Sequence, residues 1–152
     1  MHVTVRMRGE VYGLRSGRCF RVLKRAFAAA RAKFGMRLCH FAVMGNHIHF
    51  LVEAEDSAAL ARGMKGLGVR MAKALNRVMG RRGAVYADRY HLRVCRTPTQ
   101  TARALEYVRA NARKHGLIRG GLDPYSSWVA RDVVVAARSW MLAEGWRRAR
   151  GP

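Results

Sequence analysis

The chain has 152 residues, with 30 Lys and Arg against 9 Asp and Glu, and a formal net charge of +21. This length suits one domain with a real core and is too short for two domains of ordinary size. The charge favours a polyanionic partner. Nucleic acid ranks ahead of an anionic membrane because the basic residues are spread along the chain, not gathered on one amphipathic helix.

The cysteines and the N-terminal residues indicate in which cellular compartment the protein is expected. The three cysteines, Cys19, Cys39 and Cys95, show no CxxC spacing, so neither a disulfide framework nor a thiolate zinc site is expected. The first residues alternate like a strand and lack the apolar core of a signal peptide, and no stretch approaches the length of a membrane span. We therefore expect a cytoplasmic protein that does not bind membranes.

The first 35 residues predict a strand and a helix. Residues 2–7 alternate polar and apolar side chains, which is typical of a half-buried strand. Apolar residues then recur at helical spacing from Phe20 to Phe34, and Gly35 is expected to end the helix. The aromatic stripe of this helix is more typical of a core than of a binding surface.

The next segment predicts a hairpin followed by a long helix. Residues 37–44 and 47–53 read as antiparallel strands, joined by the two-residue turn Gly45-Asn46. Asp56 or Ser57 is a suitable cap for a helix that keeps one apolar face to about residue 79. Its other face is basic. The basic residues are Arg62, Lys65, Arg70, Lys73 and Arg77.

The remaining pattern sets the fold class. The segment YHLRVC predicts a strand, and a helix follows from about residue 99 to 115. The order βαββαβα predicts an α+β fold, with a ferredoxin-like split βαβ antiparallel sheet and an appended helix.

The C-terminal part reads as an extension of this fold. Residues 116–127 predict a loop, and residues 128–146 predict a last helix bearing three tryptophans. We therefore divide the chain into a catalytic domain, residues 1–127, and a C-terminal helical extension of the same domain, residues 128–152.

Two histidines stand at the start of the second hairpin strand. His47 and His49 are two apart, so a strand projects both from the same face. Two such imidazoles could supply half of the ligands of a metal site. By themselves they could equally well have only a structural role.

The helix of residues 99–115 carries a second group. Tyr107 and Asn111 are four apart and lie on one flank. By fold-level analogy, an appended helix can cover the open face of the sheet and approach the two histidines. His47, His49 and Asn111 would then hold a divalent ion, and Tyr107 would attack a DNA phosphodiester. A tyrosine that caps the core with its ring is the competing interpretation of Tyr107.

Basic and aromatic residues near this helix are candidates for DNA binding. The segment DRYHLR is suited to stacking on an unpaired base or contacting phosphate. The candidates are Arg89, Tyr90, His91, Arg93, Arg103 and Lys114.

Three segments together resemble a known family. HFAVMGNHIHFLVE, YADRYHLRVCRTPTQTARALEYVRANARKHG and DPYSS are similar to segments of the single-tyrosine HUH transposases, particularly the REP-associated tyrosine transposases. The resemblance runs from about residue 2 to 128. It places the histidine-hydrophobic-histidine motif on His47 to His49, the catalytic tyrosine on Tyr107, and a polar metal-binding residue on Asn111.

The resemblance implies a transposase that cuts and rejoins single-stranded DNA with Mg²⁺ or Mn²⁺, often beside small hairpins. Attack by the tyrosine would leave a 5′-phosphotyrosine link and a free 3′-OH. The resemblance also implies a homodimer. The alternative is a non-catalytic basic ferredoxin-like protein that binds nucleic-acid hairpins, with the two histidines structural. Composition supports both hypotheses equally.

Overall fold

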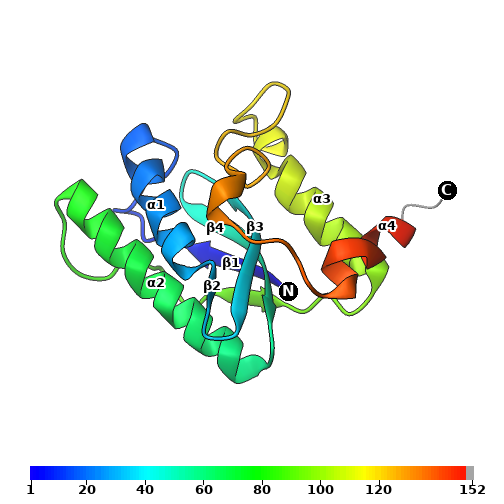
Figure 1. Cartoon of the computed structure of the whole chain (residues 1–152). Coiled ribbons are helices and arrows are strands. Elements are labelled where there is room, and N and C mark those ends of the chain that lie inside the picture. The colour runs from blue at the N-terminus through cyan, green and yellow to red at the C-terminus, as the bar shows by residue number, and fades with distance from the viewer. Residues whose placement is uncertain (150–152) are drawn as a thin grey trace.

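The computed structural model describes residues 1–149, which form one antiparallel sheet with helices on both faces (Figure 1). The five strands lie in the order β2-β3-β4-β1-β5. Their bounds are β1 (His2–Arg6), β2 (Ala32–Lys33), β3 (Met36–Val43), β4 (His47–Ala54) and β5 (His91–Arg93). The middle strand is β4, and β1 and β3 hold its backbone from both sides.

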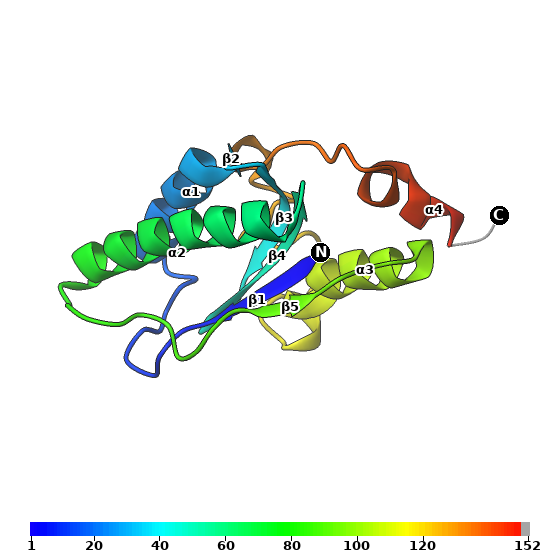
Figure 2. The same ribbon diagram turned by 90° about the horizontal axis from the view of Figure 1, so that it is seen from below.

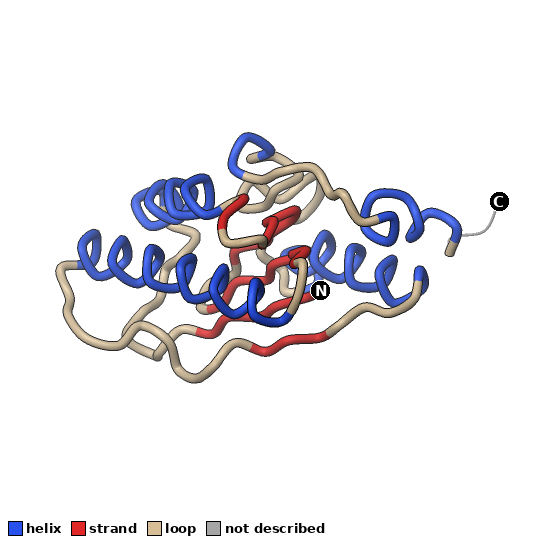
Figure 3. Tube along the Cα trace, turned by 60° about the horizontal axis from the view of Figure 1, so that its bottom comes forward, coloured by secondary structure: helices blue, strands red, loops and turns tan. Residues whose placement is uncertain are grey.

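Three long helices cover the sheet. α1 (Gly17–Ala30) and α2 (Ser57–Met79) pack against one face, and α3 (Pro98–Lys114) packs against the other (Figures 2 and 3). β1 and β3 run parallel with β4 between them, which is the split βαβ arrangement. The predicted α+β ferredoxin-like fold, with a helix on the otherwise open face, is confirmed.

Side chains of β4 alternate between two cores. Ile48, Phe50 and Val52 are buried in the core beneath α1 and α2. Leu51 belongs to the smaller core beneath α3. Because successive residues of a strand point to opposite faces, the same alternation turns His49 towards α3.

Each long helix begins at a side chain that caps it. Ser16, Asp56 and Thr97 each accept a hydrogen bond from the backbone N–H three residues further on, which satisfies a donor that the first turn leaves free. α2 ends at Gly80, whose φ of 62° is left-handed and suits glycine because it has no Cβ.

The helix predicted to reach Phe34 is shorter than expected. α1 ends at Ala30, and Phe34 and Gly35 form the turn between β2 and β3, with φ of 60° and 77°. Positive φ at both central residues is the geometry of a two-residue hairpin turn, which a helix cannot contain. The helical spacing of Phe34 is therefore fortuitous.

The single helix predicted over residues 128–146 is wrong, because the structure is helical there only in separate short pieces. Regular helical structure occurs at a single 3₁₀ turn (Arg131–Val133), a π turn (Met141–Gly145) and α4 (Trp146–Arg148). The intervening valines are β-branched, and the N–H of Val135 donates to the Leu38 carbonyl on β3, at 3.0 Å. Residues 150–152 of the predicted extension lie outside the described residues.

The loop of residues 116–127 lies against the free part of β3. The N–H of Val43 donates to the carbonyl of Tyr125, at 2.9 Å, and the N–H of Phe41 donates to Ser127 Oγ, at 3.1 Å. The DPYSS segment thus satisfies backbone groups that the sheet would otherwise leave unpaired.

An ion pair anchors this loop to the start of α1. The Arg15 guanidinium donates to both carboxylate oxygens of Asp123, at 2.8 and 2.9 Å, and also to the Val43 carbonyl. The Asp123 side chain is 1% exposed. A buried, bidentate pair of this kind fixes the geometry of both segments.

Two further observations concern the described residues. None of their helices is both long and apolar enough to span a membrane. The three cysteines are free.

Arg15→Ala should lower the free energy of unfolding by about 3–5 kcal/mol, because it leaves the buried Asp123 carboxylate without its partner. Arg8→Ala, which breaks an exposed ion pair with Glu10, should leave the free energy of unfolding almost unchanged. Denaturant unfolding of both variants measures this difference. Equal losses would show that the loop is not anchored by this pair.

Candidate active site

The cleft between the sheet and α3 holds both histidines of the predicted motif. It has a volume of about 530 Å³, and three adjacent strands and α3 line it. The lining residues central to the chemistry are His2, His47, His49, His91, Arg93 and Tyr107.

His47 has one ring nitrogen fixed by a neighbour. Its Nδ1 lies 2.8 Å from Asn46 Oδ1. Since an amide oxygen only accepts, His47 Nδ1 carries the proton and donates it. The lone pair of the neutral ring is therefore on Nε2, where it is available to a metal ion.

His49 is held more tightly. Its Nδ1 lies 3.1 Å from His2 Nε2 and 3.2 Å from Thr4 Oγ1, both on β1. Its residue exposure is 3%, and its Nε2 is buried with no hydrogen-bond partner among the described residues. A buried polar atom without a partner is costly, and a bound ion is one explanation for it.

α3 places Tyr107 against this pair. The Tyr107 ring is 5.3 Å from the His49 ring, centre to centre, in an edge-on arrangement. The residue is 40% exposed, so its hydroxyl is accessible from solvent. Of the competing tyrosines, Tyr86 donates its hydroxyl to the Gly68 carbonyl, and Tyr125 packs against Arg15.

Asn111 follows one turn later, and it is 1% exposed. Neither its amide nitrogen nor its amide oxygen has a partner among the described residues. His115, one more turn along, lies close enough to His47 and His49 to influence their charge. Asn111 thus lies between Tyr107 and His115 along the chain, and both of these approach the pair His47 and His49.

His47, His49 and Asn111 carry donor atoms of the kind that a divalent ion takes, although only the two histidines line the cleft. Two neutral imidazoles and one amide oxygen form a donor set for such an ion and leave coordination positions open. Within residues 1–149 there is no group of three or more His, Cys, Asp and Glu side chains placed to hold a metal. A site here would therefore depend on the amide as its third ligand.

Burial keeps the imidazoles neutral. It lowers the pKa of His2 to about 4 and that of His49 to about 3. The pKa of His47 is also lowered, mainly by burial and then by the nearby Arg6 charge. Neutral rings at pH 7 are the form that binds a metal ion.

The candidate DNA-binding residues divide between the two faces of the sheet. His91, Arg93 and Arg103 line the cleft. Arg89 and Tyr90 instead line a different pocket, beside α2. Arg89 and Tyr90 precede β5, which begins at His91, and the chain before the strand turns both of them towards α2.

Lys114, the last of the DNA-binding candidates, lies near Tyr107. Its Nζ is 5.6 Å from the centre of the Tyr107 ring.

Sequence reasoning missed the contribution of β1. His2, Thr4 and Arg6 line the cleft, and Thr4 and Arg6 lie directly opposite His49 and His47. The alternation of the first strand signals that these three share a face. Nothing in the pattern says that β1 pairs with β4.

Comparison with known proteins agrees with this geometry. Residues 2–111 match the family described as IS200-like transposases. No curated protein matches the sequence. A solved structure, a REP-associated tyrosine transposase bound to a REP hairpin, is similar with a TM-score of 0.62 and 17% identity. The similarity covers 90% of this chain and 84% of that one.

The chain belongs to the IS200-like transposase family, since the family match covers most of its length. The resemblance inferred from the three segments is confirmed. At 17% identity the solved structure supports the fold, which is the one described above.

Acid should destabilise the metal-free protein. The pKa values of His2 and His49 fall from 6.5 to about 4 and about 3 on folding, so below pH 6.5 the unfolded chain binds protons that the folded chain does not. Stability present above pH 6.5 is therefore lost progressively as pH falls through 4. NMR titration should show neutral His2 and His49 rings at about pH 5.5, where an unperturbed histidine is mostly protonated. Protonated rings at that pH would contradict the burial described here.

Proposed function

We propose that the protein is a metal-dependent endonuclease and strand transferase for single-stranded DNA, with Tyr107 as its nucleophile. One observation carries the proposal: the accessible Tyr107 ring packs against His49, whose Nε2 is buried and unpartnered. A phenol beside imidazole nitrogens that can bind a metal ion is an arrangement suited to covalent cleavage of a phosphodiester.

In the cleavage step, the Tyr107 oxygen forms a bond to phosphorus and releases its proton to water. The bond between phosphorus and the 3′ oxygen breaks, and that oxygen takes up a proton. The products are a 5′-phosphotyrosine and a free 3′-OH. Attack by a 3′-OH on the phosphotyrosine reverses the step, restores the phenol and joins the strands without an external energy source.

His47, His49 and Asn111 would hold Mg²⁺ or Mn²⁺ in this cleft. The ion would polarise the phosphoryl oxygens and orient the scissile bond. The protein's own part is to present two neutral imidazoles from a rigid strand and one amide from the tyrosine helix. Arg93 and Arg103, on either side of the cleft, are placed to contact phosphates of the bound strand.

The substrate we propose is single-stranded DNA beside a hairpin. The net charge of +21 suits a polyanion, and the similar solved transposase is bound to a REP hairpin. We also propose a homodimer, which rests on the family resemblance.

Tyr107→Phe should abolish covalent product, because it removes the attacking oxygen and leaves the ring in place. DNA affinity should change by less than about tenfold, the scale of one hydrogen bond. The assay mixes the protein with labelled single-stranded oligonucleotides from its genomic flanks, in Mg²⁺ or EDTA, on denaturing gels. Tyr12→Phe is the control, since Tyr12 is 70% exposed on a loop. A covalent product formed by Tyr107→Phe would refute the assignment.

His47→Ala, His49→Ala and Asn111→Ala should each reduce both Mn²⁺ affinity and cleavage. The expected loss of affinity exceeds about 100-fold, because removing a residue that only supports a ligand already costs about 10–100-fold. Calorimetric titration with Mn²⁺ measures it. His40→Gln is a matched control. His40 is a histidine with little exposure on the neighbouring strand, and its ring stacks on Trp128 outside the cleft.

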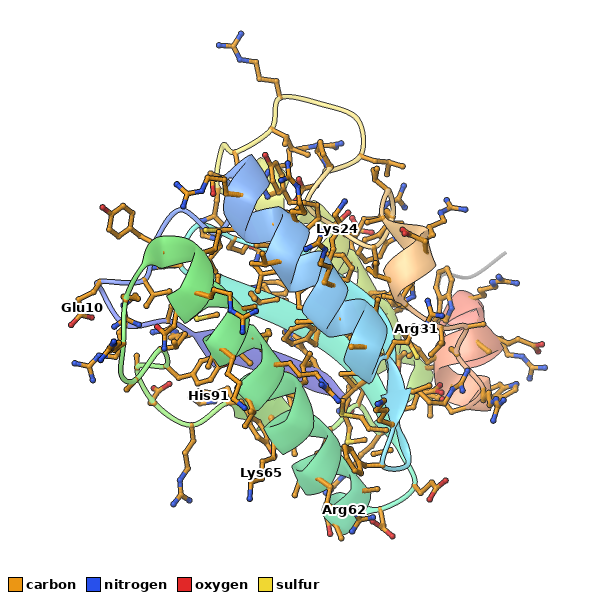
Figure 4. The ribbon with its side chains drawn as sticks, turned by 60° about the vertical axis from the view of Figure 1, so that its left-hand side comes forward. Glu10, Lys24, Arg31, Arg62, Lys65 and His91 are labelled. Atoms are coloured by element: carbon orange, nitrogen blue, oxygen red, sulfur yellow. The ribbon has the colours of Figure 1, made fainter. Side chains whose placement is uncertain are left out.

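The second candidate function, non-catalytic nucleic-acid binding, is favoured by the other face of the molecule. α1 and α2 together carry nine Arg and Lys and no Asp or Glu. Figure 4 shows this face with Lys24, Arg62 and Lys65 labelled. A groove of about 520 Å³ runs between the helices, with an alanine and valine floor and a rim of Arg25, Arg70, Lys73 and Arg77.

Replacing Arg70, Lys73 and Arg77 with Gln tests whether this groove contacts nucleic acid. If all three contact phosphates of a single strand, the slope of log affinity against log salt should become shallower by about 2. Arg119→Gln, on the loop after α3, is the control and should not change the slope. Salt-sensitive binding through this groove, without covalent product under any metal condition, would favour the binding protein over the nuclease.

A further inference from the structure

His2 and Thr4 touch His49, the more deeply buried of the two histidine ligand candidates. Both come from β1, and the strand register sets Thr4 directly opposite His49. His2 Nε2 and Thr4 Oγ1 lie 3.1 and 3.2 Å from the same atom, His49 Nδ1. The two β1 side chains therefore bracket one nitrogen of that ring, while its other nitrogen has no partner.

The position of the His49 proton follows from these contacts. A neutral imidazole carries one proton, on Nδ1 or on Nε2. On Nε2 it would be a buried donor with no acceptor among the described residues. On Nδ1 it points at two atoms that can accept it. Buried N–H groups without an acceptor are rare, so the Nδ1 position is preferred.

We propose that His2, assisted by Thr4, is a positioning residue that accepts the Nδ1 proton of His49 and so directs the lone pair of His49 Nε2 into the cleft. This inference rests on the proposed metal site.

The ring packing around His2 supports this role. Its ring centre is 5.2 Å from that of His49 and 5.7 Å from that of Tyr107. The three rings are therefore in mutual contact, and the His2 ring limits how far the His49 ring can turn. His47 gains the same fixation from Asn46, so each imidazole of the motif has its own partner for Nδ1.

The first test measures the His49 tautomer in the metal-free protein by long-range ¹H–¹⁵N NMR. The wild type should show the proton on Nδ1. In the variant His2→Leu/Thr4→Val both acceptors are gone, and the population with the proton on Nε2 should rise. His2→Gln retains an acceptor oxygen and should keep the wild-type tautomer.

The second test measures Mn²⁺ affinity by calorimetry. His2→Leu should weaken it by about 10–100-fold, the usual effect of removing a residue that orients a ligand, and His2→Gln should restore most of it. His40→Leu is the control. It removes a histidine of β3 whose ring stacks on Trp128 outside the cleft, and should leave Mn²⁺ affinity unchanged. Thermal unfolding checks that each variant is folded.

The outcomes separate this inference from the proposed function. A wild-type His49 with its proton on Nε2, or a folded His2→Leu that binds Mn²⁺ as the wild type does, would overturn the role of His2. If the wild type binds no Mn²⁺ but its His49 tautomer still depends on His2, the proposed metal site fails and the positioning of His49 stands.

Discussion

The pairing of β4 with β1 and β3 is the constraint on which the rest of the structure depends. Because β4 is hydrogen-bonded on both sides, its alternation of side chains is rigid. One set of residues fills the core under α1 and α2, and the other set faces α3. If the register of β4 against its neighbours shifted by one residue, the histidines would turn into the main core and large apolar side chains would turn towards α3. The core thus fixes the direction of the active-site imidazoles.

Burial both stabilises this fold and prepares its chemistry. α3 covers part of the second sheet face and buries His49 and Asn111, and it leaves His49 Nε2 and both amide atoms of Asn111 without partners among the described residues. That burial lowers the pKa of His49 and keeps the ring neutral. Unpartnered buried polar atoms of this kind are more typical of a functional site than of an ordinary protein interior.

Both faces of the sheet carry positive charge, but they differ in the side chains that accompany it. Near the cleft, arginines stand beside histidines and a tyrosine, so positive charge and reactive groups are close together. The α1 and α2 face carries positive charge alone, without a candidate reactive cluster. A polyanion would be attracted to both faces, and the cleft would in addition bring it close to the Tyr107 side chain.

Local patterns determined much of this protein. Alternation, helical spacing, caps and the Gly45-Asn46 turn predict the main strands and helices, and the spacings of His47 with His49 and of Tyr107 with Asn111 predict two shared faces. These features depend on residues near one another in the chain. Only the tertiary structure decided that Phe34 turns a hairpin, that Val135 bonds to β3 instead of continuing a helix, and that Arg89 and Tyr90 lie away from the cleft. It alone revealed His2 and Thr4, because their role depends on β1 pairing with a strand more than forty residues away, and no local pattern encodes that contact.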